Sequence, residues 1–539
     1  ILRRELDWSS PGLAGAKGAL DAGDTETACM ELLEYYRQRG EPRFFFRAED
    51  IPAIAEAIRE DMPEAGAELI DNAEHIVARK FPNSTARTVI YRVELPEEFS
   101  WTANPTEDPQ FKYMLQRSRF WQDLAFGYAL TGDERYAETF AEQMASWLRN
   151  VPLPHTGFGN PGKPWWLSLN AGIRGDTWPW AYAMFLHSPA MTPELHAQIL
   201  GALIVHGRFL RDHHKPPTGN WCVMEMQGLL NLAVLFPEFK EARAWRDYAR
   251  DMLVECTENQ IRPDGVQVEQ SPSYHKGCIR WFLEPMMLAE RNGVAFPPEY
   301  RETLEKMGEF AVWATDPQGR TVALSDSDRE IHTRMVLTSL AGALDRPDFA
   351  WYRDISHWHY WMFGVEGARR LRGMPRIAPK GDNQESLQAR VEPESTPEPR
   401  VPRHSLPPAG DTRTRHAGGL RKTGTVPSEA RVSVPRRDCP QVFRAPELMR
   451  VFPDAGYVFG RSDWSPGGRY FVFDCGPRGH GHGHLDLLSV EMHGFGDLLI
   501  ADPGRWSAGS SSQPPPTTPS ASTEKATTPL RPPAARLNW

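Results

Sequence analysis

Apolar residues recur at intervals of three and four from about residue 20 to about residue 315, and short turns with Gly, Pro or Asp separate the segments. This spacing is typical of amphipathic helices that bury one face. In the segment 24–39, for example, Asp24 can cap a helix whose buried side carries Leu32 and Tyr36. The pattern therefore predicts a mainly helical N-terminal part.

Consecutive helices in this part are joined by very short turns. Segments 120–130 and 134–148 flank the turn Thr131-Gly132-Asp133, which predicts an antiparallel helical hairpin. Further helices are expected at about 171–187, 193–212, 220–235, 240–259, 275–292 and 299–314. Because the pattern shows no strand between these hairpins, we predict a helical toroid or solenoid over residues 1–375.

The pattern changes twice after residue 375. Residues 376–446 are rich in Pro, Ser, Thr and Arg, which is typical of a low-complexity linker. Short β-like runs at 470–473 and 498–500 then predict antiparallel sheet, the start of a β-sandwich, over residues 447–506. Residues 507–539 form a second low-complexity segment, so the sandwich is expected to be incomplete, as a truncated or frameshifted gene would produce.

Composition limits the classes of function. A chain of 539 residues is long enough for at least two domains, and a formal net charge of -9 argues against a general nucleic-acid binder. The six cysteines have no CxxC spacing, and no apolar run reaches the roughly 18 residues that span a bilayer. The chain starts at Ile1 without a recognisable signal peptide, so localisation stays open.

Three alternating histidines give the strongest local signal. They lie in the run Gly479-His480-Gly481-His482-Gly483-His484-Leu485-Asp486, and Asp502 follows in Ala501-Asp502-Pro503-Gly504. Histidines two positions apart on a strand point to the same face, so His482 and His484 are expected to face one site. Imidazoles with a carboxylate are common zinc ligands. An adventitious surface patch is the alternative.

A second group combines an amide, a phenol and an imidazole. Gly219-Asn220-Trp221 opens a predicted helix, and Glu269 precedes the run Ser271-Pro272-Ser273-Tyr274-His275. Removal of the C5 proton of a uronate requires a base near that carbon and a donor that neutralises the adjacent carboxylate. Tyr274 can supply the base, and Asn220 with a histidine can supply the donor. Taken singly, Asn220 would be a helix cap and Tyr274 a packed aromatic residue.

A third group is aromatic and basic. Trp166 and Arg174 lie in a stretch that also carries Trp165, Asp176, Trp178 and Trp180. Rings can stack on pyranose faces while a guanidinium binds a carboxylate or sulfate, so Trp166 and Arg174 are candidates for substrate binding. Core packing is the alternative for the tryptophans.

In these motifs the chain resembles the heparinase II/III-like polysaccharide lyases, and among them most the heparinase III group. The resemblance covers about residues 20–375 and 454–506. Its carriers, in order, are 120–125, 131–136, Ala171-Gly172-Ile173-Arg174, Asn220-Trp221 with Glu225, Asp264-Gly265, Glu269, 271–275, 481–486 and Asp502-Pro503-Gly504. It implies an incomplete (α/α) toroid followed by an antiparallel β-sandwich, and a carbon–oxygen lyase that acts on an acidic polysaccharide.

The resemblance also implies roles for single residues. Tyr274 would be the catalytic base, Asn220 would neutralise the uronate carboxylate, and His482 would be the catalytic histidine. Substrate contacts would come from Arg174, Trp166, Trp221, Glu269 and His275. His484 and Asp502 would ligate a structural zinc ion, whose third ligand in the family is a later histidine. Since no histidine follows His493 here, that zinc site is expected to be incomplete unless His480 or a water substitutes.

Other interpretations remain open at this point. A toroidal glycoside hydrolase would use a carboxylate pair from Asp264, Glu269, Asp326 and Asp328. A non-catalytic glycan-binding relative would agree with the incomplete zinc site. The expected partner is heparan sulfate-like or alginate-like, with no nucleic acid and no membrane span, and the chain is expected to be a monomer or homodimer. The resemblance implies export to the periplasm or beyond, whereas a chain without a signal would stay in the cytoplasm.

Overall fold

A computed structural model describes residues 2–86, 89–106, 108, 110–151, 164–375, 448–502 and 504. The predicted linker at 376–446 and the predicted tail at 507–539 lie outside the described residues. Residues 1–380 and 449–539 belong to one compact unit, which holds both the helices and the sheet discussed below. In the described part of the chain, no helix is long and apolar enough to cross a membrane.

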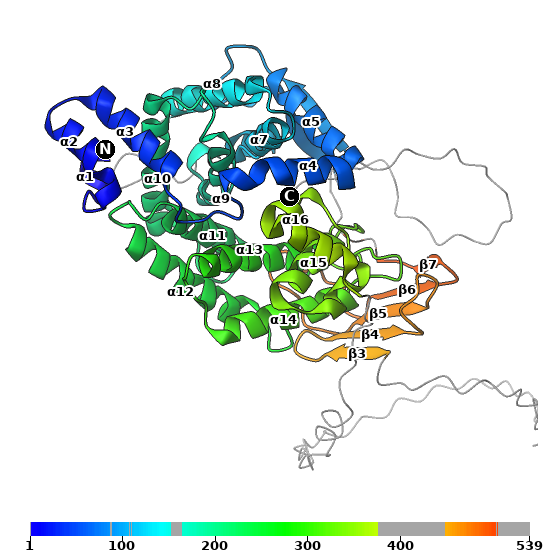
Figure 1. Ribbon diagram of the computed structural model, residues 1–539. Coiled ribbons are helices and arrows are strands. Elements are labelled where there is room, and N and C mark those ends of the chain that lie inside the picture. Colours follow the sequence, from blue (N-terminus) through cyan, green and yellow to red (C-terminus); the bar gives the residue numbers. More distant parts are fainter. Residues whose placement is uncertain are drawn as a thin grey trace, which may run out of the picture. The chain divides into compact units, whose positions relative to one another are not determined.

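Helices fill the N-terminal part, as Figure 1 shows. In chain order they are α1 (Leu2–Glu5), α2 (Ala14–Asp21), α3 (Thr25–Gln38), α4 (Ile51–Asp61), α5 (Pro63–Val77), α6 (Phe111–Arg117), α7 (Phe120–Thr131), α8 (Glu134–Asn150), α9 (Ser168–Phe185), α10 (Pro193–His213), α11 (Asn220–Leu235), α12 (Ala242–Gln260), α13 (Pro272–Arg291), α14 (Pro298–Trp313), α15 (Thr333–Leu344) and α16 (His357–Gly373). All the helices that the apolar spacing predicted are present, with ends shifted by a few residues.

The turn between α7 and α8 shows how local chemistry sets these boundaries. Gly132 ends α7 in the left-handed region (φ 71°), which glycine adopts without steric cost. Asp133 then caps α8 by accepting a hydrogen bond from the amide of Arg135 at 3.0 Å. The predicted hairpin is therefore confirmed, and its inward face carries Phe140, Met144 and Trp147.

Two helices, α9 and α11, are buried on nearly all sides and pack against each other at the centre of the helical part. Glycines allow their backbones to approach closely. A Cβ atom at Gly175 would lie 2.8 Å from the Cα atom of Gly228, and one at Gly228 would lie 2.3 Å from the carbonyl oxygen of Gly172. Any side chain at these positions would push the helices apart, and with them Asn220 at the start of α11.

An early helix and the last helix of the helical part meet. Helix α4 contacts α16, and the Tyr360 hydroxyl donates a hydrogen bond of 2.7 Å to Asp61 Oδ2 at the end of α4. Arg369 forms an ion pair with the same carboxylate at 3.0 Å. The helices from α4 to α16 therefore curve back towards their start, which favours the toroid of the two predicted architectures.

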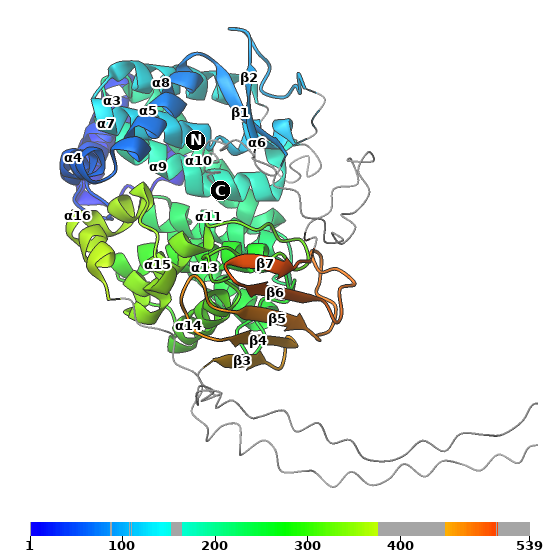
Figure 2. The ribbon, with the colours of Figure 1, turned by 90° about the vertical axis from the view of Figure 1, so that its right-hand side faces the viewer.

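One expectation about the helical part was wrong. Strands β1 (Lys80–Ala86) and β2 (Val89–Glu94) form an antiparallel pair between α5 and α6, visible in Figure 2, where no strand had been predicted. The first of these runs contains Pro82, Asn83 and Ser84, which are poor strand formers. Backbone pairing with β2 forms the strand in spite of that local preference.

The C-terminal part is a five-stranded antiparallel sheet in the order β3 (Met449–Phe452), β4 (Tyr457–Arg461), β5 (Tyr470–Asp474), β6 (Val490–Gly494) and β7 (Asp497–Ile500). Alternation along the strands separates two faces. One face is buried and includes Tyr457, Phe459 and Val472. On the other face, Met449, Met492 and Ile500 are 51%, 38% and 48% exposed, without a covering layer among the described residues.

Aromatic residues join the buried face of the sheet to α14. The ring of Phe310 lies 5.1 Å from Phe452, 5.5 Å from Tyr457 and 5.8 Å from Phe459, measured between centroids. The Tyr470 hydroxyl donates a 2.9 Å hydrogen bond to the carbonyl of Trp313 at the end of α14. The sheet and the helices therefore share one core.

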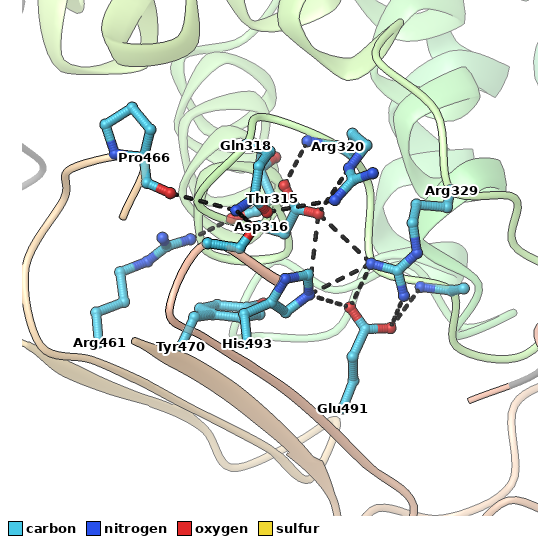
Figure 3. A network of polar contacts seen from close by, with 12 residues as sticks. Thr315, Asp316, Gln318, Arg320, Arg329, Arg461, Pro466, Tyr470, Glu491 and His493 are labelled. Atoms are coloured by element: carbon cyan, nitrogen blue, oxygen red, sulfur yellow. Dashed lines mark hydrogen bonds and ion pairs between the residues drawn. The ribbon is translucent and has the colours of Figure 1, made fainter. Parts of the chain in front are cut away.

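A buried polar network fixes the register of this contact, as drawn in Figure 3. Arg329 binds both carboxylate oxygens of Glu491 on β6, at 3.0 and 2.6 Å, and reaches Asp316 at 3.4 Å. His493 contacts Glu491 at 3.0 Å, and the side chains of Glu491 and Asp316 are fully buried. Burial alone would raise the pKa of Glu491, but its bonds to His493 and Arg329 outweigh burial and lower the pKa.

Replacing Arg329 by alanine should destabilise the protein by about 3–5 kcal/mol, because it leaves the buried carboxylate of Glu491 without its cation. Urea unfolding measures this loss. The matched control is Arg469→Ala in the exposed loop between β4 and β5, which should change stability by less than about 0.5 kcal/mol. Equal effects of the two variants would contradict the assigned importance of the Arg329–Glu491 contact.

The same variant should show a defined pH dependence. A carboxyl group with a lowered pKa stabilises the folded state above its unfolded value of about 4.5, and this contribution is lost as the pH falls through the folded value. The stability difference between wild type and Arg329→Ala should therefore be full at neutral pH and shrink below about pH 4.5. A difference that stays constant down to pH 3 would show that another interaction carries it.

Candidate active site

The ring of Tyr274 stacks on the imidazole of His482. Their centroids are 3.6 Å apart and their planes differ by 12°. Tyr274 lies in the first turn of α13 and is partly exposed, whereas His482 lies in the loop between β5 and β6. The fold thus brings together a phenol from the helical part and an imidazole from the sheet, which lie more than 200 positions apart in the sequence.

Asp326 binds both of the histidines that were expected to face one site. Its Oδ2 atom lies 2.9 Å from His482 Nδ1, and its Oδ1 atom lies 2.9 Å from His484 Nε2. Burial would raise the pKa of Asp326, but the hydrogen bonds to His482 and His484 outweigh burial and lower the pKa. The two imidazoles do share a site, although they lie in a loop and not on the strand that the argument assumed.

Two of the glycines that alternate with the histidines occupy positions where a larger side chain would not fit. A Cβ atom at Gly479 would lie 2.3 Å from the carbonyl oxygen of Glu269, and one at Gly483 would lie 2.6 Å from the Cα atom of Gly479. The loop therefore folds tightly on itself and against residues 268–270, where the amide of His480 donates to the carbonyl of Val268 at 3.0 Å. This close approach holds His482 over Tyr274.

Asn220 is buried at the start of α11 and is oriented by Glu269. Its side-chain amide donates to the two carboxylate oxygens of Glu269 at 3.0 and 2.9 Å. The backbone amide of Asn220 donates to the same carboxylate at 3.3 Å. Glu269 is itself buried, so it is placed to position Asn220 more than to contact a polysaccharide directly.

Arg117, at the end of α6, is a site residue that the sequence argument missed. Burial lowers the pKa of its guanidinium, and charge interactions with Tyr113 and Tyr274 oppose this effect. Its Nε donates to Asn170 Oδ1 at 3.0 Å, which holds it in place. A guanidinium beside a phenol favours the phenolate, the form that can accept a proton.

Two of the predicted substrate contacts lie in the core. Arg174 is fully buried and donates to His206 Nε2, the Gln116 carbonyl and the Trp165 carbonyl at 2.8, 2.9 and 2.7 Å. Trp166 is 1% exposed and packs against His206. The structure places both side chains in the core, where Arg174 uses its donors inside the protein, so their binding of substrate stays a prediction that these contacts do not support.

His275 is also a core residue. Its Nδ1 accepts a hydrogen bond from the amide of Gln267 at 3.2 Å, and its Nε2 donates to the carbonyl of Met307 at 2.9 Å. Burial lowers its pKa to about 4, so the ring is neutral at physiological pH. This residue supports the α13–α14 contact, and its predicted contact with substrate stays a prediction. Trp221 is partly exposed and packs beside Met224 and Trp281, so it stays a candidate for substrate contact.

The predicted zinc ligands each have partners within the protein. His484 is bound to Asp326, while Asp502 accepts hydrogen bonds from the Ser489 hydroxyl at 2.5 Å and the Gly504 amide at 2.8 Å. Among the described residues, no group of three potential ligands includes His484 or Asp502. His480, named as a substitute, is exposed. The zinc site at His484 and Asp502 therefore stays a prediction.

Three of the four carboxylates proposed for a hydrolase are engaged in other contacts. Asp326 binds two histidines, and Glu269 binds Asn220. Asp264 accepts hydrogen bonds from the backbone amides of Val266 and Ala455 at 3.3 and 2.8 Å. This arrangement gives no support to an acid and base pair of carboxylates.

The fold and the site define a helical toroid joined to a β-sheet domain, with a tyrosine–histidine pair where they meet. The model of the heparinase II/III N-terminus matches residues 3–346, and that of the heparinase II/III-like C-terminal region matches residues 444–528. The first match alone covers more than half of the 539 residues, so the chain belongs to the heparinase II/III family. The second match extends into the predicted low-complexity tail.

Curated relatives match the chain over part of their length. A heparin-sulfate lyase of Pedobacter heparinus is 30% identical over 335 residues, which is 61% of this chain and 49% of that protein. A heparin-sulfate lyase of Bacteroides thetaiotaomicron is 29% identical over 316 residues, which is 58% of this chain and 44% of that protein. The chain thus spans about half the length of the curated relatives it matches.

Solved structures share the fold. A crystal structure of heparinase III has a TM-score of 0.64 at 20% identity, covering 93% of this chain and 66% of that one. A heparan sulfate lyase of Pedobacter heparinus has a TM-score of 0.57 at 21% identity, with 93% and 64% covered. The predicted fold class, an (α/α) toroid followed by antiparallel β-sandwich structure, is confirmed by this likeness.

Replacing Asp326 by asparagine should loosen the histidine loop, because one neutral amide cannot replace a carboxylate that accepts hydrogen bonds from both imidazoles. Hydrogen–deuterium exchange at residues 479–486 should become faster, while exchange in α7 and α8 stays unchanged. Asp328→Asn, two positions away, is the control. Unchanged exchange in the loop would mean that the glycine packing alone holds His482 in place.

Proposed function

We propose that this chain is a polysaccharide lyase that cleaves a uronate-containing glycan by β-elimination. The observation that carries the proposal is the stacked pair of Tyr274 and His482, 3.6 Å apart, contributed by the two parts of the fold. The buried amide of Asn220, oriented by Glu269, supplies the uncharged donor that the reaction also needs. Membership of the heparinase II/III family supports the same reaction.

In the proposed reaction, the Tyr274 oxygen removes the C5 proton of the uronate, and the amide of Asn220 stabilises the negative charge that develops on its carboxylate. The electron pair left at C5 forms the C4–C5 double bond as the C4–O bond breaks. The leaving oxygen then takes the proton from the Tyr274 hydroxyl. His482, held by Asp326, lies against the phenol and orients it.

For the substrate, we propose a heparan sulfate-like glycan in preference to an alginate-like one. Both curated relatives described above are heparin-sulfate lyases, which supports this choice. The site also carries Arg117, whose guanidinium suits a carboxylate or a sulfate group. A non-catalytic glycan-binding protein is the second candidate, because His484 and Asp502 bond to different partners, Asp326 and Ser489, and not to a common one.

Incubating the full chain with heparan sulfate should produce an unsaturated uronate, detected by its ultraviolet absorbance. Tyr274→Phe keeps the ring that stacks on His482 but lacks the oxygen, so activity should fall by at least about a thousandfold. Trp281→Phe is the control, since Trp281 packs beside Trp221 outside the proposed proton-transfer groups. Product from alginate alone would overturn the substrate assignment, and binding without product on any glycan would favour the glycan-binding alternative.

Replacing Arg117 by glutamine should change the pH dependence of the reaction. The guanidinium favours the phenolate of Tyr274, so its loss should move the rise of activity with pH towards higher pH and lower kcat/KM by about tenfold or more at neutral pH. A pH series of initial rates measures both effects. A uniform loss at every pH would indicate that Arg117 binds substrate without acting on Tyr274.

A further inference from the structure

A second group of chemically active side chains lies where α10 passes into α11. His214 directly follows α10, and Cys222 and Glu225 lie in the first two turns of α11. One nitrogen, sulfur or oxygen atom of each side chain lies within 4.8 Å of the other two. In the part of the chain that the structure describes, this is the one such group of three or more His, Cys, Asp or Glu side chains.

The carboxylate of this group is buried and has few donors. Glu225 is fully buried, and its Oε2 accepts a hydrogen bond from the amide of Lys215 at 2.6 Å. Its Oε1 is buried and makes no hydrogen bond of ordinary geometry, although the Ser168 hydroxyl interacts with this carboxylate. A buried carboxylate with so few donors is costly, and a cation at this point would compensate it.

The imidazole of the group lies beside the thiol. His214 Nδ1 lies 4.0 Å from the sulfur of Cys222 and 2.7 Å from the carbonyl oxygen of Lys215, while Nε2 lies 2.6 Å from the hydroxyl of Tyr248. Because a carbonyl oxygen only accepts, Nδ1 carries the proton here and Nε2 accepts from Tyr248. Binding of a metal at Nδ1 would move the proton to Nε2, which would then donate to Tyr248, and would replace the contact with Lys215.

The thiol completes the group. Cys222 is fully buried on α11, one turn before Glu225. Cysteine binds metals as the thiolate, so binding would release the thiol proton. Sulfur, imidazole nitrogen and carboxylate oxygen together are ligands that Zn²⁺ accepts.

We propose that His214, Cys222 and Glu225 form a binding site for a divalent transition metal of the zinc type. The metal would join the end of α10 to the start of α11 and so fix residues 215–219, which lead directly into Asn220. This site differs from the one that the family resemblance implied at His484 and Asp502, and it does not depend on the proposed lyase activity.

The test is a titration of the full chain, first treated with a chelator, with Co²⁺ and then Zn²⁺. We expect one equivalent of Co²⁺ to bind with a thiolate-to-cobalt charge-transfer absorption that Zn²⁺ abolishes. Cys222→Ser should lose this absorption, and Tyr248→Phe, which removes the partner of His214, should weaken binding by about tenfold to a hundredfold. Cys29→Ser on α3 and His484→Ala are controls that should leave both readouts unchanged.

Circular dichroism checks that each variant is folded. Absence of the charge-transfer absorption in the wild type, or its persistence in folded Cys222→Ser, overturns the proposal. If Cys222→Ser does not fold, Glu225→Gln decides the matter, because it keeps the size of the side chain. It should retain the absorption with an affinity at least about tenfold weaker, and an unchanged affinity would exclude Glu225 as a ligand.

Discussion

The contact between Arg329 and Glu491 is the interaction on which the candidate active site depends. It is buried, bidentate and joined to Asp316 and His493, so it fixes one register between the sheet and the segment that follows α14. Charged groups in such a setting tolerate little displacement, because a small shift leaves a buried charge unpaired. The loop that follows β5 starts from this fixed sheet, so the same register also determines where His482 lies.

The candidate active site combines two residues on packed helices with one residue in a loop. Asn220 and Tyr274 stand at the first turns of two long, buried helices, which packing holds in place. His482 stands in a glycine-rich loop and depends on Asp326 and on the close approach of Gly479 to Glu269. Glu269 takes part in both arrangements, since its carboxylate orients Asn220 while its backbone supports the histidine loop. A substitution of Glu269 would therefore affect both the orientation of Asn220 and the support of the histidine loop.

Polar residues that lie near apolar side chains have two different roles in this protein: some support the core, and others belong to the candidate active site. Arg174 and His275 lie among aromatic and aliphatic side chains and use their hydrogen-bonding groups on backbone carbonyls, on a backbone amide or on another buried ring. Arg117 and Asp326 are less deeply enclosed and meet groups with reactive chemistry. Residue type and spacing alone do not separate these cases, because neither records how deeply a side chain is buried or what it meets there.

The sequence by itself determined the elements whose cause is local. The apolar spacing, the caps at Asp24 and Asp133 and the glycine at position 132 define the helices, and the motifs indicate Asn220, Tyr274 and His482 as site residues. Only the tertiary structure decided which polar groups are buried, that β1 pairs with β2, and that Asp326 joins His482 to His484. These outcomes arise from contacts between segments far apart in the chain, whose energies no local pattern contains.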